Sequence, residues 1–298
     1  MLGSALLRSF EKNSEIETLG VTRQNSDLRD KSEFGSLVEA FRPDTVVHAA
    51  AKVGGIQANI DNPFGFLNDN LQMDTNVIST CLDHGVQNFL YIGSSCMYPK
   101  DCQQPLTESN LLSGAFEPTN EGYALAKIAG AKLCEFASSS AGVSYRTVIP
   151  SNLYGPGDNF DPRKSHLIAS IIRKVHDTKS QGKKSIEVWG GGQARREFTF
   201  TEDLADWLVS VCTRVEELPP YLNVGFGQDF TVTELYEAAM NVIGVSAHLE
   251  YDLTKPEGME RKLLDSSRAL QEANWKPRTQ LQDGLAQTYQ WYLNHKQN

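Results

Sequence analysis

The chain has 298 residues, of which 40% are hydrophobic and 22% charged, so it can form a full core and divide into two lobes. Its net charge of −9 argues against broad binding to nucleic acid or to an acidic membrane. No apolar run reaches the roughly 18 residues that suggest a membrane span. The five cysteines are scattered without a CxxC pair, so we expect no disulfide framework and no metal site, and a reducing, cytoplasmic setting.

Strand-like and helical segments alternate in the first half of the chain. Such alternation implies parallel βαβ units with right-handed crossovers, and hence an α/β fold with a Rossmann-type doubly wound sheet over residues 1–152. The looser pattern over residues 153–298 predicts mainly a smaller α/β substrate lobe, with segments that return to the first lobe. In chain order, the expected elements are strand Ile16–Val21, helix Ser32–Phe41, strand Thr45–Ala50, helix Gly65–His84, strand Phe89–Ile92, helix Tyr123–Ser139, strand Tyr145–Ile149, helix Ser165–Thr178 and strand Glu197–Thr201.

The first residues already have a helical pattern. A dinucleotide-binding fold begins with a strand and a glycine-rich turn, followed by a helix whose N-terminus faces the pyrophosphate. Leu2–Leu7 matches the start of that helix, and Gly3 then corresponds to the third glycine, which allows close packing of helix and strand. We therefore expect that the first strand is absent and that this chain folds poorly and holds its cofactor weakly. A melting transition as cooperative as that of an extended chain would contradict this expectation.

Tyr123 and Lys127 are four residues apart in a predicted helix, so their side chains share one face. A nearby ammonium lowers the pKa of a tyrosine from about 10 and lets it exchange a proton near neutrality. The spacing alone is weak, but Ser94 stands at the end of a predicted strand, where its hydroxyl can bind a substrate carbonyl beside the tyrosine. The same spacing recurs, without such a serine, at Tyr251 and Lys255 and at Tyr292 and Lys296.

These residues and several longer segments resemble the GDP-L-fucose synthases, a family of extended short-chain dehydrogenases/reductases. The resemblance covers essentially the whole chain after its start. It implies an NADP-dependent oxidoreductase with epimerase activity, which inverts C3 and C5 of GDP-4-keto-6-deoxy-D-mannose and then reduces its C4 ketone to give GDP-L-fucose. The segments that carry the resemblance are Ala49–Ile56, Gly93–Lys100, Glu117–Glu121, Asn152–Pro156, Arg196–Phe198 and Arg261–Asp265.

The resemblance assigns catalytic roles to five residues. Ser94, Tyr123 and Lys127 correspond to the Ser-Tyr-Lys set, and Cys96 and His166 to the base and acid of the epimerisation. Both inverted carbons are α to the ketone, so polarising its oxygen makes their protons acidic. Inversion requires a base on one face and an acid on the other, and a thiol and an imidazole can both titrate near neutrality. Taken alone, the cysteine is more typical of a small buried hydrophobe and the histidine of a surface residue.

The cofactor preference is indicated by Arg23, which follows the expected strand ending at Val21. An arginine there accommodates the 2′-phosphate of NADP(H), whereas an acidic residue favours NAD. Arg196 is the best candidate for the pyrophosphate of the substrate, because a guanidinium binds phosphate oxygens in pairs. The cofactor contacts that the resemblance implies are Gly3, Asp27, Leu28, Tyr123, Lys127 and His166, together with Arg23. The corresponding substrate contacts are Ser94, Ser95, Asn152, Lys174, Trp189, Arg196 and Lys262.

Other activities remain as alternatives. A nucleotide-sugar 4,6-dehydratase typically has Asp-Glu after the serine motif, where this chain has Cys96-Met97, and a 4-epimerase would lack the Cys–His pair. Another extended short-chain dehydrogenase, acting as an epimerase or reductase on a nucleotide sugar, stays open. So does an inactive truncated protein that only binds NADP or a sugar nucleotide. Family members are usually homodimers, and the helices expected at Gly65–His84 and Tyr123–Ser139 are the candidate contact.

Overall fold

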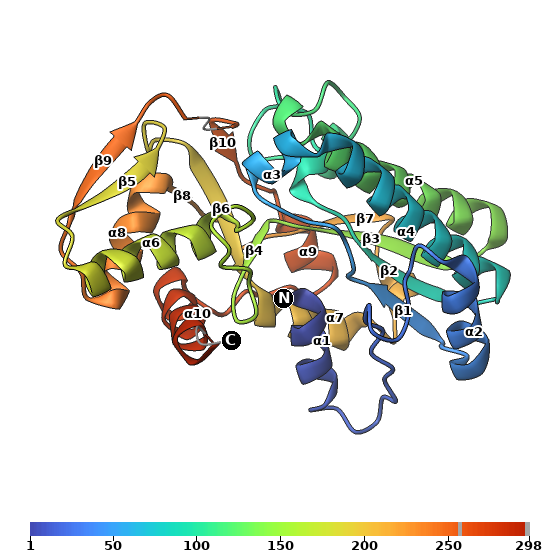
Figure 1. The fold of residues 1–298 in the computed structure, drawn as a ribbon. Coiled ribbons are helices and arrows are strands. Elements are labelled where there is room, and N and C mark those ends of the chain that lie inside the picture. Colours follow the sequence, from blue (N-terminus) through green and yellow to red (C-terminus); the bar gives the residue numbers. More distant parts are fainter. Residues whose placement is uncertain (256–257, 296–298) are drawn as a thin grey trace.

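The computed structural model describes residues 1–255 and 258–295, which form two lobes of α/β structure (Figure 1). A four-stranded parallel sheet in the order β1-β2-β3-β7 is the centre of the first lobe. The last of these strands comes late in the chain, so the polypeptide returns to the first lobe after building part of the second. The strands are β1 (Thr45–His48), β2 (Asn88–Ile92), β3 (Ser144–Pro150) and β7 (Tyr221–Val224).

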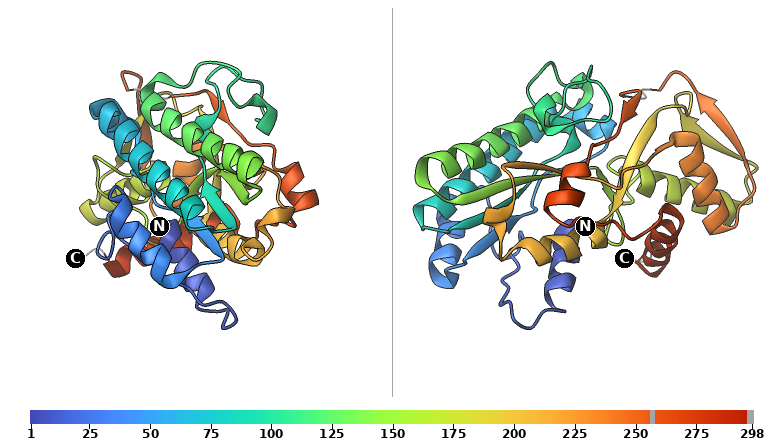
Figure 2. Two further views of the ribbon diagram at one scale, coloured as in Figure 1. Left: turned by 90° about the vertical axis from the view of Figure 1, so that its right-hand side faces the viewer. Right: turned by 180° about the vertical axis from the view of Figure 1, so that it is seen from behind.

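Helices cover both faces of this sheet, as the two further views show (Figure 2). Strand β2 explains why: Phe89 and Tyr91 point into one apolar cluster, and Leu90 and Ile92 into another. A strand buried on both faces must be apolar at every position, which is what parallel sheets require. The predicted doubly wound α/β fold is therefore confirmed. One face carries α2 (Lys31–Phe41), α4 (Pro63–Asp83) and α5 (Glu121–Ala141), and the other α1 (Leu2–Phe10), α7 (Thr201–Val211) and α9 (Ser267–Glu272).

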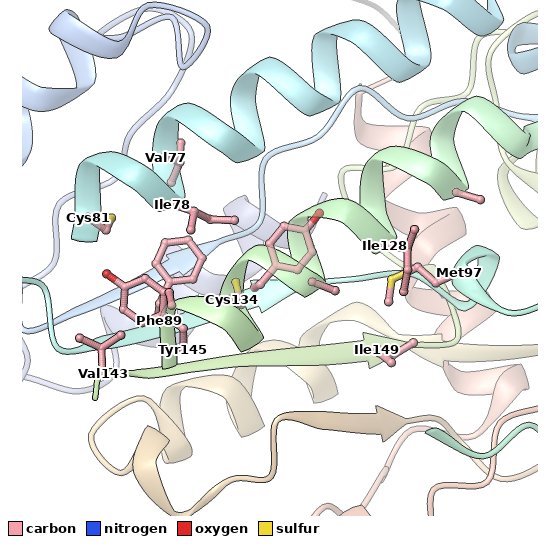
Figure 3. Packing of buried hydrophobic residues seen from close by; sticks show 14 of the residues in the cluster. Val77, Ile78, Cys81, Phe89, Met97, Ile128, Cys134, Val143, Tyr145 and Ile149 are labelled. Carbon is pink, nitrogen blue, oxygen red and sulfur yellow. The ribbon is translucent and has the colours of Figure 1, made fainter. Parts of the chain in front are cut away.

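The core beneath α4 and α5 fixes these two helices against the sheet (Figure 3). Phe89 and Tyr145, from neighbouring strands, stack with ring centroids 5.0 Å apart. Val77 and Ile78 of α4 and Cys134 of α5 close over them. Because protein interiors are close-packed, this contact sets the spacing between α4, α5 and β2 that the functional site uses.

Two expectations about the start of the chain are wrong: the strand at Ile16–Val21 and the close packing of Gly3 against a strand. Ile16–Val21 is not a strand: among the described residues no other strand pairs with it, and a strand needs such a partner. β1 lies at the edge of the sheet and pairs with β2 alone, so Thr45–Val47 are half-buried rather than fully buried. Gly3 is exposed, and a Cβ added there would have no atom within 4 Å. The reason is that α1 packs on α7 through Leu2 and its neighbours and turns Gly3 outwards.

The second lobe is built on short strands around a separate apolar cluster. One sheet has the order β10-β6-β4 with β8 antiparallel to β6, and β5 pairs with β9 beside it. Among the helices of residues 1–255 and 258–295, none combines the length and apolarity that a membrane crossing requires. The elements are β4 (Asn152–Tyr154), α6 (Leu167–Gln181), β5 (Ser185–Trp189), β6 (Arg195–Phe200), β8 (Asp229–Thr231), α8 (Val232–Ile243), β9 (His248–Asp252), β10 (Arg261–Lys262) and α10 (Leu281–His295).

Candidate active site

Ser94 and Cys96 lie just beyond the carboxyl end of β2, the edge of an open α/β sheet where ligands bind. The chain turns there into a short 3₁₀ helix, η1 (Ser95–Met97). Ser94 caps this turn, since its Oγ accepts from the backbone N–H of Cys96 at 3.2 Å. The turn leaves Ser94 and Cys96 half-buried and Ser95 buried, so the serine hydroxyl and the thiol face the site while Ser95 packs inward.

Tyr123 enters from the first turn of α5 and meets Ser94. The two hydroxyl groups lie within hydrogen-bonding reach of each other. Burial, then the neighbouring Cys96 and Asp74, raises the pKa of Tyr123 well above its ordinary value, and the Ser94 hydrogen bond offsets only part of this. The expectation that Lys127 would favour the phenolate is therefore wrong for this state, and the tyrosine is held protonated.

The ammonium of Lys127 faces a buried aspartate, Asp74. Lys127 Nζ is 3.8 Å from Asp74 Oδ2 and lies over the ring of Tyr91, 4.5 Å from its centroid. Tyr91 Oη donates to the same carboxylate oxygen at 2.5 Å, and His48 Nε2 donates to Asp74 Oδ1 at 2.8 Å. All four side chains are buried. They join β1, α4, β2 and α5 into one polar network inside an otherwise apolar core.

The charges of this network compensate each other. Burial alone would raise the pKa of Asp74, but the Lys127 charge and the His48 hydrogen bond outweigh it and lower that pKa. Burial lowers the pKa of Lys127, and Asp74 opposes that shift. An ion pair satisfied in this way is stable in a low dielectric only because both partners are present. Asp74 is thus the counter-ion of the buried Lys127.

Cys96 has two hydrogen-bond donors from distant parts of the chain. Asn120 Nδ2, at the end of the 3₁₀ helix η3 (Pro118–Asn120), lies 3.2 Å from Cys96 Sγ. Lys262 Nζ, on β10, lies 3.6 Å from the same sulfur. Lys262 is buried, and the electrostatic effect of Cys96 on Tyr123 shows that the sulfur also neighbours the phenol. The structure thus brings together Ser94, Cys96, Tyr123 and Lys262.

His166 is the N-cap residue of α6 and is half-buried. Its loop is tied to the segment after β1, since Gly55 N donates to Lys164 O at 3.3 Å. A Cβ at Gly55 would lie 2.7 Å from Ser165 O, so only glycine allows this close approach. Burial raises the pKa of Asp158, and the charge of nearby His166 opposes the shift. Asp158 Oδ2 is buried without a hydrogen-bond partner, which gives the imidazole an acidic neighbour.

The basic residues expected at the substrate nucleotide lie on the second lobe. Arg196 on β6 is in register with Lys262 on β10, so the two side chains share one face of the pair. Asp229 binds Arg195 and Arg261 on the opposite face, at 3.0 and 2.5 Å. Asn152 Nδ2 donates to the carbonyl of Glu197 at 3.0 Å, which anchors β4 to β6.

Lys174 and Trp189 lie together on an exposed face of this lobe, near Glu187. Lys174 Nζ is 5.6 Å from the indole centroid, and Lys255 Nζ lies 5.4 Å from it. Trp189 Nε1 donates to Glu187 Oε2 at 3.0 Å, and Lys174 Nζ donates to the Glu187 carbonyl at 2.9 Å. Trp189 is 40% exposed, so its ring is partly open to solvent.

Comparisons with known proteins agree with this geometry. The model of the NAD dependent epimerase/dehydratase family matches residues 1–225. The chain belongs to this family. It is 43% identical to GDP-L-fucose synthase 1 of Arabidopsis thaliana, with 99% of this chain and 91% of that protein covered. It is 42% identical to GDP-L-colitose synthase of Yersinia pseudotuberculosis, with 100% and 96% covered. Its structure is similar to a GDP-mannoheptose C4 reductase from Campylobacter jejuni with NADP bound, at a TM-score of 0.86 and 28% identity, covering 98% and 95% of the two chains.

Of the residues expected at the cofactor, His166 lies on the second lobe and the others on the first. Arg23 is exposed, and Asp27 binds Arg29 through a 2.6 Å ion pair. The hydrogen bond from Arg29 lowers the pKa of Asp27 to about 2, so the carboxylate is charged but engaged with its own neighbour. Leu28 is partly buried and packs against the core of the first lobe.

Sequence reasoning missed five residues of the site. A signal was available for Asp74. It is a charged residue at a core position of an amphipathic helix, between the buried Met73 and Val77. No comparable signal marks the others, because they meet only in the fold. The missed residues are His48, Asp74, Tyr91, Asn120 and Asp158.

The tyrosines of the other two pairs lie on the second lobe, not on α5. Tyr251 lies on β9 and contacts Thr233 Oγ1 at 3.0 Å. Tyr292 is buried in α10, and Lys296 lies outside the described residues.

Proposed function

We propose that this chain converts GDP-4-keto-6-deoxy-D-mannose to GDP-L-fucose, by epimerisation at C3 and C5 followed by reduction of the C4 ketone with NADPH. The observation that carries the proposal is the position of Cys96: its sulfur neighbours the Ser94–Tyr123 pair and has Lys262 beside it. A reductase needs only the serine, tyrosine and lysine. A thiol next to the group that polarises the ketone adds what proton abstraction from an α-carbon requires.

The first lobe has groups that fit NADP(H). The N-terminus of α1 has no side-chain cap, so its first N–H groups can bind a phosphate. Arg23 is exposed and suits a 2′-phosphate, as expected from the sequence. NADPH supplies the hydride that the C4 carbon receives. Lys127 lies one turn from Tyr123 in α5, where it can also hold ribose hydroxyls.

In the epimerisation, Ser94 and Tyr123 hydrogen-bond the C4 oxygen and stabilise the negative charge that develops on it. Cys96 removes the proton from the α-carbon on one face. His166 delivers a proton to the opposite face, with Asp158 as its acidic neighbour. The same pair serves C3 and C5, because both carbons are α to the one ketone.

In the reduction, Tyr123 donates its proton to the C4 oxygen. A tyrosine whose pKa is raised is protonated at neutral pH and is therefore ready to act as the donor. Lys127, one helical turn away, is paired with Asp74. For the substrate, Arg196, Lys174 and Trp189 are the residues we assign to the pyrophosphate and the guanine, and Asn152 to the sugar side of the pocket. Ser95, expected there from the sequence, packs inward instead.

The test supplies GDP-4-keto-6-deoxy-D-mannose and NADPH, follows the loss of absorbance at 340 nm and identifies the product. Tyr123→Phe should abolish NADPH consumption, and Tyr251→Phe, from the pair that matches only in spacing, should not. A product that keeps the manno configuration would replace the proposal with a C4 reductase. Because the chain is as similar to a GDP-L-colitose synthase as to a GDP-L-fucose synthase, the assay is repeated with the 3-deoxy analogue of this substrate, and the preferred substrate separates the two activities.

The proposal includes a cytoplasmic homodimer formed through α4 and α5. The outer face of these helices has an apolar groove, and Phe136 is 58% exposed beside it. A face of this kind is typical of a subunit contact. Light scattering after gel filtration should give twice the 33.0 kDa chain mass, and Phe136→Asp should give the monomer. The groove is lined by Thr75, Ile78, Ser79, Leu82, Leu133, Phe136, Ala137 and Ser140.

A further inference from the structure

We propose that Lys262 and Asn120 are positioning residues that hold the sulfur of Cys96 as the base of the epimerisation, a role that rests on the proposed function. Both side chains reach Cys96 Sγ, at 3.6 Å from Lys262 Nζ and 3.2 Å from Asn120 Nδ2. The family resemblance had placed Lys262 among the substrate contacts. The geometry assigns it first to the thiol.

The burial of Lys262 is the first argument. Its side chain is 9% exposed, and lysine is rarely buried unless a partner compensates its charge. Among residues 1–255 and 258–295, no carboxylate lies within ion-pair distance of its Nζ, and Cys96 Sγ is the polar atom that it reaches. The neighbouring basic residues differ, since Arg195 and Arg261 both bind Asp229. The cation facing Cys96 therefore lacks the counter-ion that the cations on the opposite face have.

The position of Lys262 is also specific. β10 has only two residues and is held parallel to β6 by the register Arg261↔Arg195 and Lys262↔Arg196. Leu264 N, just after the strand, donates to the buried carboxylate of Glu197 at 2.9 Å. A short strand fixed at both ends leaves its side chains little choice of direction, so Lys262 is aimed at the sulfur by the backbone.

Asn120 supplies the second argument. It is the N-cap residue of α5, where an asparagine side chain usually accepts a hydrogen bond from the first helical N–H groups and stabilises the helix. Asn120 makes no such cap, and its Oδ1 is buried without a partner. Its amide instead donates to Cys96. A residue that gives up a stabilising cap and leaves an acceptor unsatisfied has been placed for another purpose, a pattern typical of functional sites.

The chemistry explains what the two donors do. The thiolate form of Cys96 is the base, and an ammonium and an amide N–H both stabilise a negative sulfur. Neither donor can itself take the proton, because the ammonium has no lone pair. As the α C–H bond breaks, its proton moves to Cys96 Sγ and its electron pair forms the enolate held by Ser94 and Tyr123. His166 then gives its proton to the carbon from the other face. Before the second inversion the Cys96 thiol loses its proton to solvent and His166 regains one from solvent.

The experiment separates the two half-reactions in Lys262→Met and Asn120→Ala. Epimerisation is followed as deuterium wash-in at C3 and C5 of GDP-4-keto-6-deoxy-D-mannose in D₂O, with NADP⁺ in place of NADPH. Hydride transfer is followed as single-turnover oxidation of GDP-L-fucose by NADP⁺, which uses Tyr123 but not Cys96. A third readout is alkylation of Cys96 by iodoacetamide, measured peptide by peptide. Cys102, which is also partly exposed and free, is the internal control.

We expect Lys262→Met to slow wash-in and Cys96 alkylation by about tenfold or more, since both depend on the thiolate. GDP-L-fucose oxidation and Cys102 alkylation should change by less than about threefold. Asn120→Ala should act in the same direction, and Lys262→Arg should restore part of the alkylation rate because it keeps the charge.

Two results would overturn the assignment. Unchanged alkylation with a raised KM would make Lys262 a substrate contact only, and equal losses in both half-reactions would make its role structural. If the unaltered enzyme shows no wash-in at all, the proposed function itself fails, and the two failures are thereby distinguished.

Discussion

The two sides of the active site are built in different ways. The reducing side, Tyr123 and Lys127, lies on the 21-residue helix α5 and is backed by a buried network of paired charges. The side that we propose for the epimerisation depends on a 3₁₀ turn, where Cys96 lies, and on a two-residue strand, which brings Lys262 to the Cys96 sulfur from a distant part of the chain. His166 is the N-cap residue of α6. Regular elements thus position the groups that we propose for hydride transfer. Irregular segments position those that we propose for the epimerisation.

Substitution of Tyr123 tests this separation most directly and should have the largest effect. In Tyr123→Phe the proton donor to the C4 oxygen is lost, so we expect NADPH oxidation to fall by about 10²- to 10⁴-fold. Deuterium wash-in at C3 and C5 should fall less, because Ser94 still binds the ketone and Cys96 is unchanged. Single-turnover absorbance and NMR of the sugar measure the two effects. Equal losses in both would mean that the two sides of the site are not separable.

The buried ion pair behind Lys127 should give the largest effect on stability. Asp74→Asn leaves Lys127 as a buried cation without its counter-ion, which costs about 3–5 kcal/mol of unfolding free energy. Asp69→Asn on the same helix is the matched control, because the Lys52–Asp69 pair is partly exposed and such pairs contribute about 0–1 kcal/mol. Urea unfolding of both variants makes the comparison. A small effect of Asp74→Asn would show that water reaches Lys127.

Sequence patterns predicted the regular half of the molecule well, since apolar periodicity determines α4, α5, β2 and β3 locally. They failed at Ile16–Val21. This segment has the composition of a strand, but among the described residues no other strand pairs with it. A strand is a relation between two segments, so local patterns cannot decide it. The same limit explains the site. Tyr123 and Lys127 have a fixed spacing, whereas the contacts of Asn120 and Lys262 with Cys96 arise only from the fold.

Glu197 offers a pH-dependent test of the irregular side. Burial raises its pKa from 4.5 to about 7, although the N–H groups of Leu264 and Gly227 act against the shift. The folded state therefore binds more protons than the unfolded state between these pH values. This group favours folding below pH 4.5, and that contribution is lost as the pH rises through about 7. The raised pKa corresponds to about 3 kcal/mol, at ~1.4 kcal/mol per pH unit.

Glu197→Gln should remove that slope from the unfolding free energy, measured by urea titration between pH 5 and 8. Glu250→Gln, at an exposed position on β9, should leave the slope as it is. A slope that persists in Glu197→Gln would assign the proton uptake to another group. On the reducing side, where Asp74 has a cation as its partner, the same pH range should have no comparable effect.

The smallest expected effects on stability come from two glycine-to-alanine substitutions, which test how closely α5 can approach the buried polar network around Asp74. Alanine favours a helix over glycine by about 1 kcal/mol, so Gly3→Ala on the exposed face of α1 should stabilise the protein by about that amount. Gly130→Ala should do the opposite. Its Cβ would lie 2.4 Å from Tyr91 Oη and 3.1 Å from Asp74 Oδ2, and overpacking of this kind costs about 1–3 kcal/mol. Thermal melts of the two variants should therefore shift in opposite directions. Equal shifts would mean that α5 can move away from β2 without cost, and that the buried network does not fix the position of Lys127.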